Sequence, residues 1–215
     1  MSYGIPGVPM LPPGGPGVGV PLELPKDVVR VGEQALWSTQ AVSAANQKNT
    51  TYRLFSTPLG QSGQGFTPMT ISETNIKEGG RIPAGLAYDT YGVAAVVKGS
   101  GVTQCGAVEA IAAYQNACLS WDFLATVIDI APVALVGAGG GLFGISPGNP
   151  ANNDLPFVNN GTGGLWVYRR HPIALPANTT FNILLRFGGT DATTTAASEI
   201  QIVLVGAYRQ AVEIG

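Results

Sequence analysis

Two glycine-rich motifs within residues 137–164 match signatures of cofactor-binding or catalytic sites. Residues 139–144 read Gly-x-Gly-x-x-Gly, the dinucleotide fingerprint, which needs a helix whose N-terminus receives the pyrophosphate. Pro147 and Pro150 follow at once and prevent such a helix. Residues 144–148 read Gly-Ile-Ser-Pro-Gly, the nucleophile-elbow pattern, but proline lacks the N–H that would stabilise an oxyanion. We therefore expect neither a cofactor nor a nucleophile here.

The remaining ionisable residues show no catalytic or metal-binding pattern either. His171 is the only histidine, and its place before Pro172 at the end of a predicted strand favours a structural or surface role over proton transfer. A calcium loop needs several carboxylates, whereas residues 152–154 supply one. We expect no catalytic residue, no cofactor and no metal, and so no enzyme. Sequence spacing does not place any two of the following carboxylates together as a catalytic pair: Glu73, Glu78, Glu109, Asp122 and Asp129.

Cys105 and Cys118 are not at metal-ligand spacing, and their sequence positions leave two alternatives open. They pair if neighbouring elements bring them together, and otherwise they are buried free thiols, which is the alternative we favour.

The elements that would position any site are β-strands, and the clearest are in the last third of the chain. Alternating or apolar runs over residues 165–170, 180–187 and 199–209 are separated by Pro, Asn and Gly turns. Alternation places two sets of side chains on single sheet faces: Phe181, Ile183, Leu185 and Phe187 in one strand, and Ile200, Ile202 and Leu204 in the next.

The rest of the chain adds further strands and one helix. Residues 24–40 lead into the domain, 41–48 form a helical turn, and Gln104–Asn116 has helical spacing of apolar residues. Residues 137–164 read as a long loop of the kind that contacts partners. The pattern predicts an all-β antiparallel sandwich or jelly roll. The further strands are predicted over residues 51–56, 86–97, 117–124 and 126–130, followed by 133–136.

Three formal glycosylation sequons begin at Asn49, Asn160 and Asn178. We expect these asparagines to serve as turn residues.

The chain is poorly charged. Only 11% of residues are charged and the pI is about 5.3, whereas an average soluble domain is about 25% charged. A surface this poor in charge favours contacts with other copies or with lipid, although a β protein that is polar without charge remains an alternative. No run of Lys or Arg exists to neutralise phosphates, so we expect no direct sequence-specific binding of nucleic acid.

Residues 1–22 form a separate segment, which we interpret as an extended N-terminal arm preceding the domain of residues 23–215. About half of the arm is Gly and Pro, and no charge precedes Glu23. Its apolar residues favour an arm that lies on a neighbouring subunit or a membrane over a solvated tail. The predicted contact residues between copies are Tyr3, Ile5, Met10, Leu11 and Val18 in the arm, and Leu142, Phe143 and Phe157 in the long loop.

Three stretches resemble the jelly-roll capsid proteins of tailless icosahedral bacterial viruses. Residues 75–84 contain an Asn followed by Gly-x-Ile-Pro-Ala, residues 172–181 precede the penultimate strand, and residues 200–209 read Ile-x-Ile-x-Leu-x-Gly-x-x-Arg. The resemblance implies a single jelly roll with an arm. It also implies a major or minor capsid protein, made in the host cytoplasm and located in the virion.

The partners implied by this resemblance are other copies in capsomer trimers or hexamers, other capsid proteins, and an internal lipid membrane. The alternative function is a β-sandwich adhesin or carbohydrate-binding module. Such a module would use exposed aromatic side chains as a sugar platform, with Trp37, Trp121, Trp166 and Tyr168 as the candidates.

Overall fold

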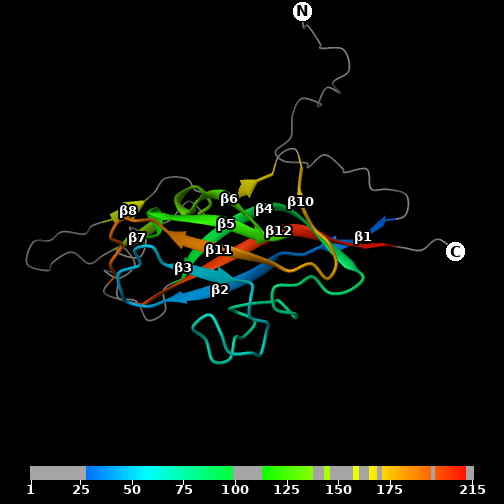
Figure 1. Ribbon diagram of the computed structural model, residues 1–215, viewed down its shortest axis with the longest axis horizontal. Helices are drawn as coiled ribbons and strands as arrows, with labels where there is room; N and C mark the ends of the chain where they lie inside the picture. The colour runs from blue at the N-terminus through cyan, green and yellow to red at the C-terminus, as the bar shows by residue number, and fades with distance from the viewer. Residues whose placement is uncertain are drawn as a thin grey trace, which may run out of the picture.

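Two antiparallel sheets pack face to face in the computed structural model (Figure 1). In the first sheet, long strands from opposite ends of the described chain lie side by side. Its strands are β1 (Val28–Glu33), β2 (Leu36–Val42), β4 (Leu86–Lys98), β9 (Trp166–Val167), β10 (Ile173–Leu175) and β12 (Ser198–Ala211).

The second sheet holds β3 (Thr51–Leu54), β5 (Ala117–Phe123), β6 (Thr126–Pro132) and β11 (Phe181–Phe187). A separate hairpin joins β7 (Phe143–Ile145) to β8 (Phe157–Asn159), and a 3₁₀ helix, η1 (Val133–Leu135), follows β6. The structure describes residues 28–98, 113–137, 143–145, 157–159, 165–168, 171–194 and 197–211.

The strand pairing is nested, and this makes the sandwich a single jelly roll. Counting inward from the two ends of the described chain, β2 pairs with β12, β3 with β11, β4 with β10, and β5 with β6. The resulting orders are β2-β12-β4-β10 in one sheet and β3-β11-β5-β6 in the other. An antiparallel ribbon rolled up on itself has this order. The predicted fold class, including a short helix at residues 113–115, is confirmed.

The core lies between the two sheets and contains the faces that the alternation predicts. The side chains of Phe181, Ile183 and Leu185 on β11 are fully buried, as are those of Ile200 and Ile202 on β12. Burying each of these side chains contributes roughly 1.5–3 kcal/mol to stability. On the opposite face of β11, Arg186 is exposed.

The closing motif of residues 200–209 has a structural explanation. Gly206 lies at a bulge in the β12–β4 pairing, and an added Cβ would lie 2.1 Å from the Asp89 carbonyl oxygen and 2.7 Å from the Tyr88 ring. Three residues further on, Arg209 Nε lies 2.6 Å from Asp89 Oδ2, a largely buried ion pair between the two strands. Gly206 allows β12 to approach β4 closely, and the ion pair between Arg209 and Asp89 links the two strands.

We predict that Gly206→Ala lowers the free energy of unfolding by about 3 kcal/mol, because backbone on β4 leaves no room for the methyl group. Gly32→Ala on β1 is the matched control, since no atom lies within 4 Å of its added Cβ. This control is expected to change stability by less than about 0.5 kcal/mol. Denaturant unfolding of both variants measures the difference, and equal stabilities would contradict the assignment.

A long connection, residues 55–85, covers the outer edge of β2. The Asn75 side chain accepts a hydrogen bond from Trp37 N–H (2.9 Å) and donates one to the Ala35 carbonyl (2.8 Å). Gln64 accepts from Ala41 N–H through its own carbonyl and donates its side-chain amide to the Thr39 carbonyl, both at 2.9 Å. The connection therefore satisfies backbone groups that an edge strand would otherwise expose.

The same connection is also bonded to the second sheet at Gly80, next to β3 and at the start of β11. The Gly80 N–H donates to the Phe55 carbonyl (2.6 Å), and its carbonyl accepts from Phe181 N–H (2.8 Å), with φ of +61°. The Asn75–Ala84 motif thus has a structural role: Asn75 bonds the backbone of β2, and Gly80, with its positive φ, bonds the backbone of Phe55 and Phe181.

The structure corrects several sequence-based predictions. Residues 41–48 form no helical turn, because β2 runs to Val42 and an irregular turn follows. Residues 133–136 follow Pro132 as a 3₁₀ turn and not as a strand. Residues 137–164 are not a continuous loop, since they contain the β7–β8 hairpin. The lead-in of residues 24–40 contains β1 and β2.

Two of the predicted turn asparagines are confirmed, because Asn49 and Asn178 both have a φ of +59°. Asn160, the arm of residues 1–22 and residues 104–112 of the predicted helix lie outside the described residues.

Two buried tyrosines make stability sensitive to alkaline pH. The Tyr88 hydroxyl donates between the carbonyls of Gln34 (2.7 Å) and Leu204 (2.9 Å), and that of Tyr114 lies 3.0 Å from Ser198 Oγ. Burial, together with the nearby Tyr208, raises the pKa of Tyr88 well above 10.0, and burial likewise raises that of Tyr114. The folded state therefore holds these protons more tightly than the unfolded chain does.

We predict that stability is constant with respect to these groups below about pH 10 and falls above it, by up to roughly 1.4 kcal/mol per pH unit for each tyrosine. The sign follows because the unfolded tyrosines ionise first. Denaturant unfolding across this range measures the slope, and Tyr114→Phe is expected to reduce it. Phenolate absorbance from all tyrosines in a chain that stays folded near pH 10 would contradict the prediction.

Candidate interaction surface

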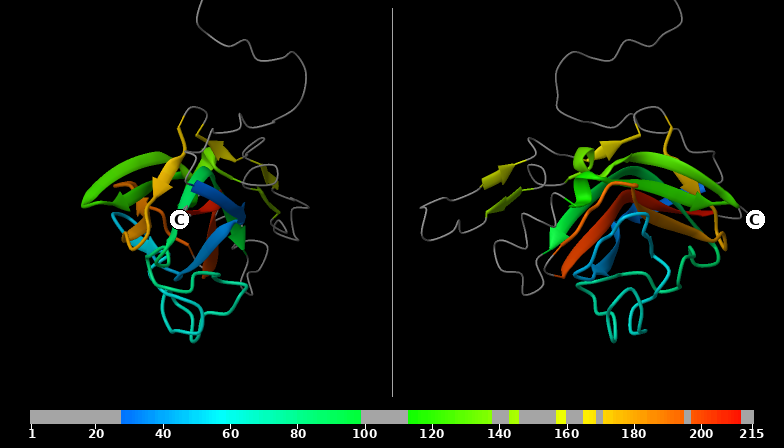
Figure 2. Two further views of the ribbon diagram at one scale, coloured as in Figure 1. Left: turned by 90° about the vertical axis from the view of Figure 1, so that its right-hand side faces the viewer. Right: turned by 60° about the vertical axis from the view of Figure 1, so that its left-hand side comes forward.

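The two long sides of the sandwich are built differently. On one side, β2 and β3 are accompanied by the connection of residues 55–85, which Figure 2 shows below the sheets. On the other side, β6 ends one sheet and β10 ends the other. In Figure 2, β6 and β9 lie toward the top of the molecule, away from that connection at the bottom.

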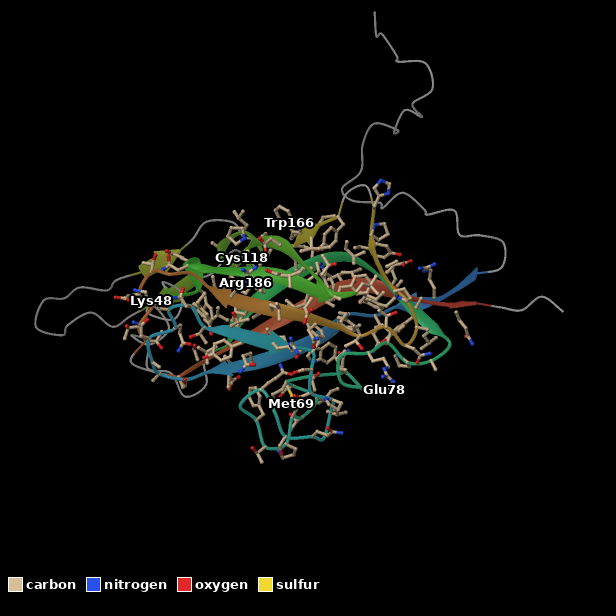
Figure 3. The ribbon with its side chains drawn as sticks, in the orientation of Figure 1. Lys48, Met69, Glu78, Cys118, Trp166 and Arg186 are labelled. Carbon is tan, nitrogen blue, oxygen red and sulfur yellow. The ribbon has the colours of Figure 1, made fainter. Side chains whose placement is uncertain are left out.

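A surface hollow of about 670 Å³ lies between these two edge strands and β9. Its volume is in the range of ligand and peptide sites, roughly 300–1,000 Å³. Trp166 from β9 lies at this side of the molecule, remote from Met69 on the connection (Figure 3). The hollow is lined by Trp121, Phe123, Ile128, Asp129, Ile130, Trp166, Val167, Tyr168, His171, Pro172, Ile173 and Ala174.

The register of β6 explains why the hollow is apolar. Ile128 lies opposite Trp121 of β5, whose side chain points into the core with 2% of its surface exposed. Ile128 therefore belongs to the core-facing side of the sheet, yet 52% of its surface is exposed. Within the described residues, the first sheet does not extend far enough to cover it. Among the described residues, the core-facing side of β6 is thus only partly covered.

Six exposed apolar side chains lie on the elements next to this hollow, and Ile128, Trp166 and Val167 line it. Three come from the β5–β6 hairpin and three from β9 and the residue before it. Patches of this kind on a protein surface mark contacts with other molecules. We call this set the open apolar edge: Leu124, Val127, Ile128, Leu165, Trp166 and Val167.

Two of the polar side chains that line the hollow, Tyr168 and Asp129, are hydrogen-bonded within the chain. Tyr168 accepts a hydrogen bond from the Trp121 ring N–H (2.8 Å), and burial raises the pKa of its hydroxyl. The Asp129 carboxylate accepts from Ser120 (2.7 Å) and from Arg186 (3.0 Å). These contacts hold the carboxylate on the outer face of the sheet. His171 is exposed, in agreement with a surface role.

One of the two cysteines lies in the described part of the chain. Cys118 is a partly buried free thiol, and burial, aided by Asp129, raises its pKa, while Cys105 lies outside the described residues. Among the described residues, no cluster of His, Cys, Asp or Glu is suited to a metal ion. The same part of the chain contains no helix long and apolar enough to span a membrane.

The predicted contact residues fall mostly beyond what the structure describes. Phe143 and Phe157 lie on β7 and β8, in a hairpin where Ile145 pairs with Phe157, and their side chains are outside the described part. Gly144 also lies on β7, so the dinucleotide-like motif runs into a strand. Residues Tyr3, Ile5, Met10, Leu11, Val18 and Leu142 lie outside the described residues.

Of the aromatic residues considered for a sugar platform, one is exposed. Trp121 is buried, Trp37 and Tyr168 are half-buried, and Trp166 has 37% of its surface exposed. The Trp37 ring N–H is already bonded to the Ile71 carbonyl (2.9 Å).

The β5–β6 hairpin is the part of this surface that the sequence did not indicate. The sequence predicts a strand over residues 126–130 without indicating that most of it, as β6, is exposed. The two-residue turn places Leu124 and Ala125 at φ of +51° and +59°, a conformation usually given to Asn-Gly. The sequence does contain one indication of this tight turn: the predicted strands 117–124 and 126–130 follow each other without any Gly, Pro, Asn or Asp between them.

We predict that replacing Leu124 and Ala125 with Asn and Gly raises the free energy of unfolding by about 1 kcal/mol, because left-handed backbone is costly for Leu and Ala. As a control, Ala84→Gly alters an exposed turn residue without a left-handed φ and is expected to lower stability by a few tenths of a kcal/mol. Thermal unfolding compares the two, and a destabilised Asn-Gly variant would contradict the turn assignment.

Comparisons with protein-family models, with curated proteins and with solved structures give no match.

Proposed function

We propose that this chain is a structural protein of a virus particle, a major or minor capsid protein that assembles with further copies of itself into an icosahedral shell. The observation that carries the proposal is the open apolar edge on a jelly roll whose opposite side is covered. The jelly roll alone does not decide between functions, because the same architecture occurs in lectins and enzymes.

The distribution of charge supports contact at this edge. On the outer face of the second sheet, Arg53 pairs with Asp122 (3.1 Å) and Arg186 with Asp129 (3.0 Å), as expected of a solvated face. The open apolar edge has exposed Leu, Val, Ile and Trp instead. Association there would bury apolar area and add backbone bonds along the edge of β6. Other capsid proteins or an internal lipid membrane are further proposed partners in the virion.

We predict that Ile128→Glu raises the concentration required for assembly at least about tenfold, because a buried unpaired charge costs more than roughly 1.4 kcal/mol. The variant should fold normally, since the side chain is half exposed in the single chain. Light scattering with electron microscopy of the full chain provides the measurement.

Ile71→Glu is the matched control, because 60% of Ile71 is exposed on the connection at the opposite side. It should leave assembly unchanged. A wild-type chain that stays at 22.1 kDa at every concentration would overturn the proposal.

The second candidate function is a carbohydrate-binding module, which the surroundings of Trp166 favour. An exposed tryptophan near the exposed His171 provides an apolar face with a polar group nearby, as sugar sites do. Screening the full chain against a glycan array separates the two functions. A monomer that binds glycans, and loses binding in Trp166→Ala, would favour this candidate over the capsid protein.

A further inference from the structure

We propose that the hollow between β6, β9 and β10 binds residues 6–12 of the N-terminal arm of a neighbouring copy. The inference rests on the proposed self-assembly and specifies one contact that would hold copies together. It joins two independent features, a periodic proline pattern in the arm and an aromatic hollow on the domain.

Within residues 6–12 of the arm, every third residue is a proline. Pro6, Pro9 and Pro12 are separated by Gly7-Val8 and by Met10-Leu11, and the whole stretch is uncharged. A polyproline II helix has three residues per turn, so these prolines would form one continuous ridge. Proline also restricts the unbound chain, which lowers the entropy lost on binding.

The hollow has the composition that recognises such a ridge. Polyproline segments dock in aromatic-lined grooves, and here Trp166, Tyr168 and Phe123 contribute to the lining. The backbone carbonyls of a polyproline helix have no internal partners and need donors. The Tyr168 hydroxyl accepts from Trp121, so its own proton is available to donate to such a carbonyl. An uncharged ligand also matches this hollow, because the carboxylate of the lining residue Asp129 is held on the outer face of the sheet by Arg186.

The chain between Pro12 and the first described strand is long enough to reach a neighbour. Residues 13–27 separate Pro12 from β1, which begins at Val28. In an extended polyproline conformation this distance is about 50 Å, against a domain diameter on the order of 40 Å. The neighbouring copy, rather than the same chain, is the proposed source, because a self-bound arm would cover the open apolar edge and remove it from assembly.

The test is photo-crosslinking in the full chain, with a benzophenone side chain in place of Met10. Copies labelled with light and heavy isotopes are mixed before assembly, and crosslinked peptides are identified by mass spectrometry. The expected crosslinks join position 10 to residues 166–174 or to β6, and about half of them join light to heavy copies, as random mixing requires. Crosslinks that map elsewhere, or that never join light to heavy copies, would overturn the inference.

Two variants test the recognition itself. Replacing Pro6, Pro9 and Pro12 with Ala, or making Trp166→Ala, should each lower the crosslink yield about tenfold, since aromatic anchors dominate such contacts. Trp166→Tyr should restore most of the yield. The same benzophenone at Ser62, on the opposite connection, is the control and should give no crosslink to residues 166–174. An unchanged yield in both variants would contradict the assignment.

Light scattering of the same samples separates this inference from the proposed function. Shells that form with position 10 crosslinked elsewhere would reject the arm contact and leave the capsid proposal intact. Crosslinks in the hollow between copies that form only small oligomers would support the arm contact and reject the shell.

Discussion

A β-sandwich has edge strands whose outer backbone groups lack partners, and the treatment of each edge determines how its surface behaves. In this chain the edge of β2 is satisfied by Gln64 and Asn75 from the connection of residues 55–85. The edge of β6 receives no comparable cover among the described residues, and its core-facing Ile128 is half exposed. The backbone groups at the β2 edge are thus hydrogen-bonded within the chain, whereas the β6 edge exposes an apolar side chain of the core-facing side.

This asymmetry follows from the nested strand pairing. The rolled ribbon brings β12 between β2 and β4, and β11 between β3 and β5, so the longest strands lie inside the sheets. The short strands β9 and β10, and β6 with its bulged pairing to β5, are left at the margin. Apolar residues on marginal strands find too few partners within one chain. Burial against another molecule is the physical means of covering them.

Much of the fold was predictable because its signals are local. Alternation identified β11 and β12, and continuous apolar sequence identified β4. The arrangement of the open side depended on longer-range facts. Leu124 and Ala125 are not typical turn residues, although they form the β5–β6 turn. The strands β7 and β8 lie within glycine-rich sequence, which does not predict strands. The exposure of Ile128 depends on where the facing sheet ends. The closing motif indicated a strand, whereas the contact of Gly206 with Tyr88 required the β12–β4 register.

Hydrogen–deuterium exchange of the full chain over a series of protein concentrations tests the central claim most directly. The account predicts that amides of β6 and of residues 166–168 become protected as concentration rises, while those of the connection at residues 59–72 exchange at an unchanged rate. Exchange at β6 that is the same at every concentration, or protection confined to the connection, would contradict the claim that the open side is where copies meet.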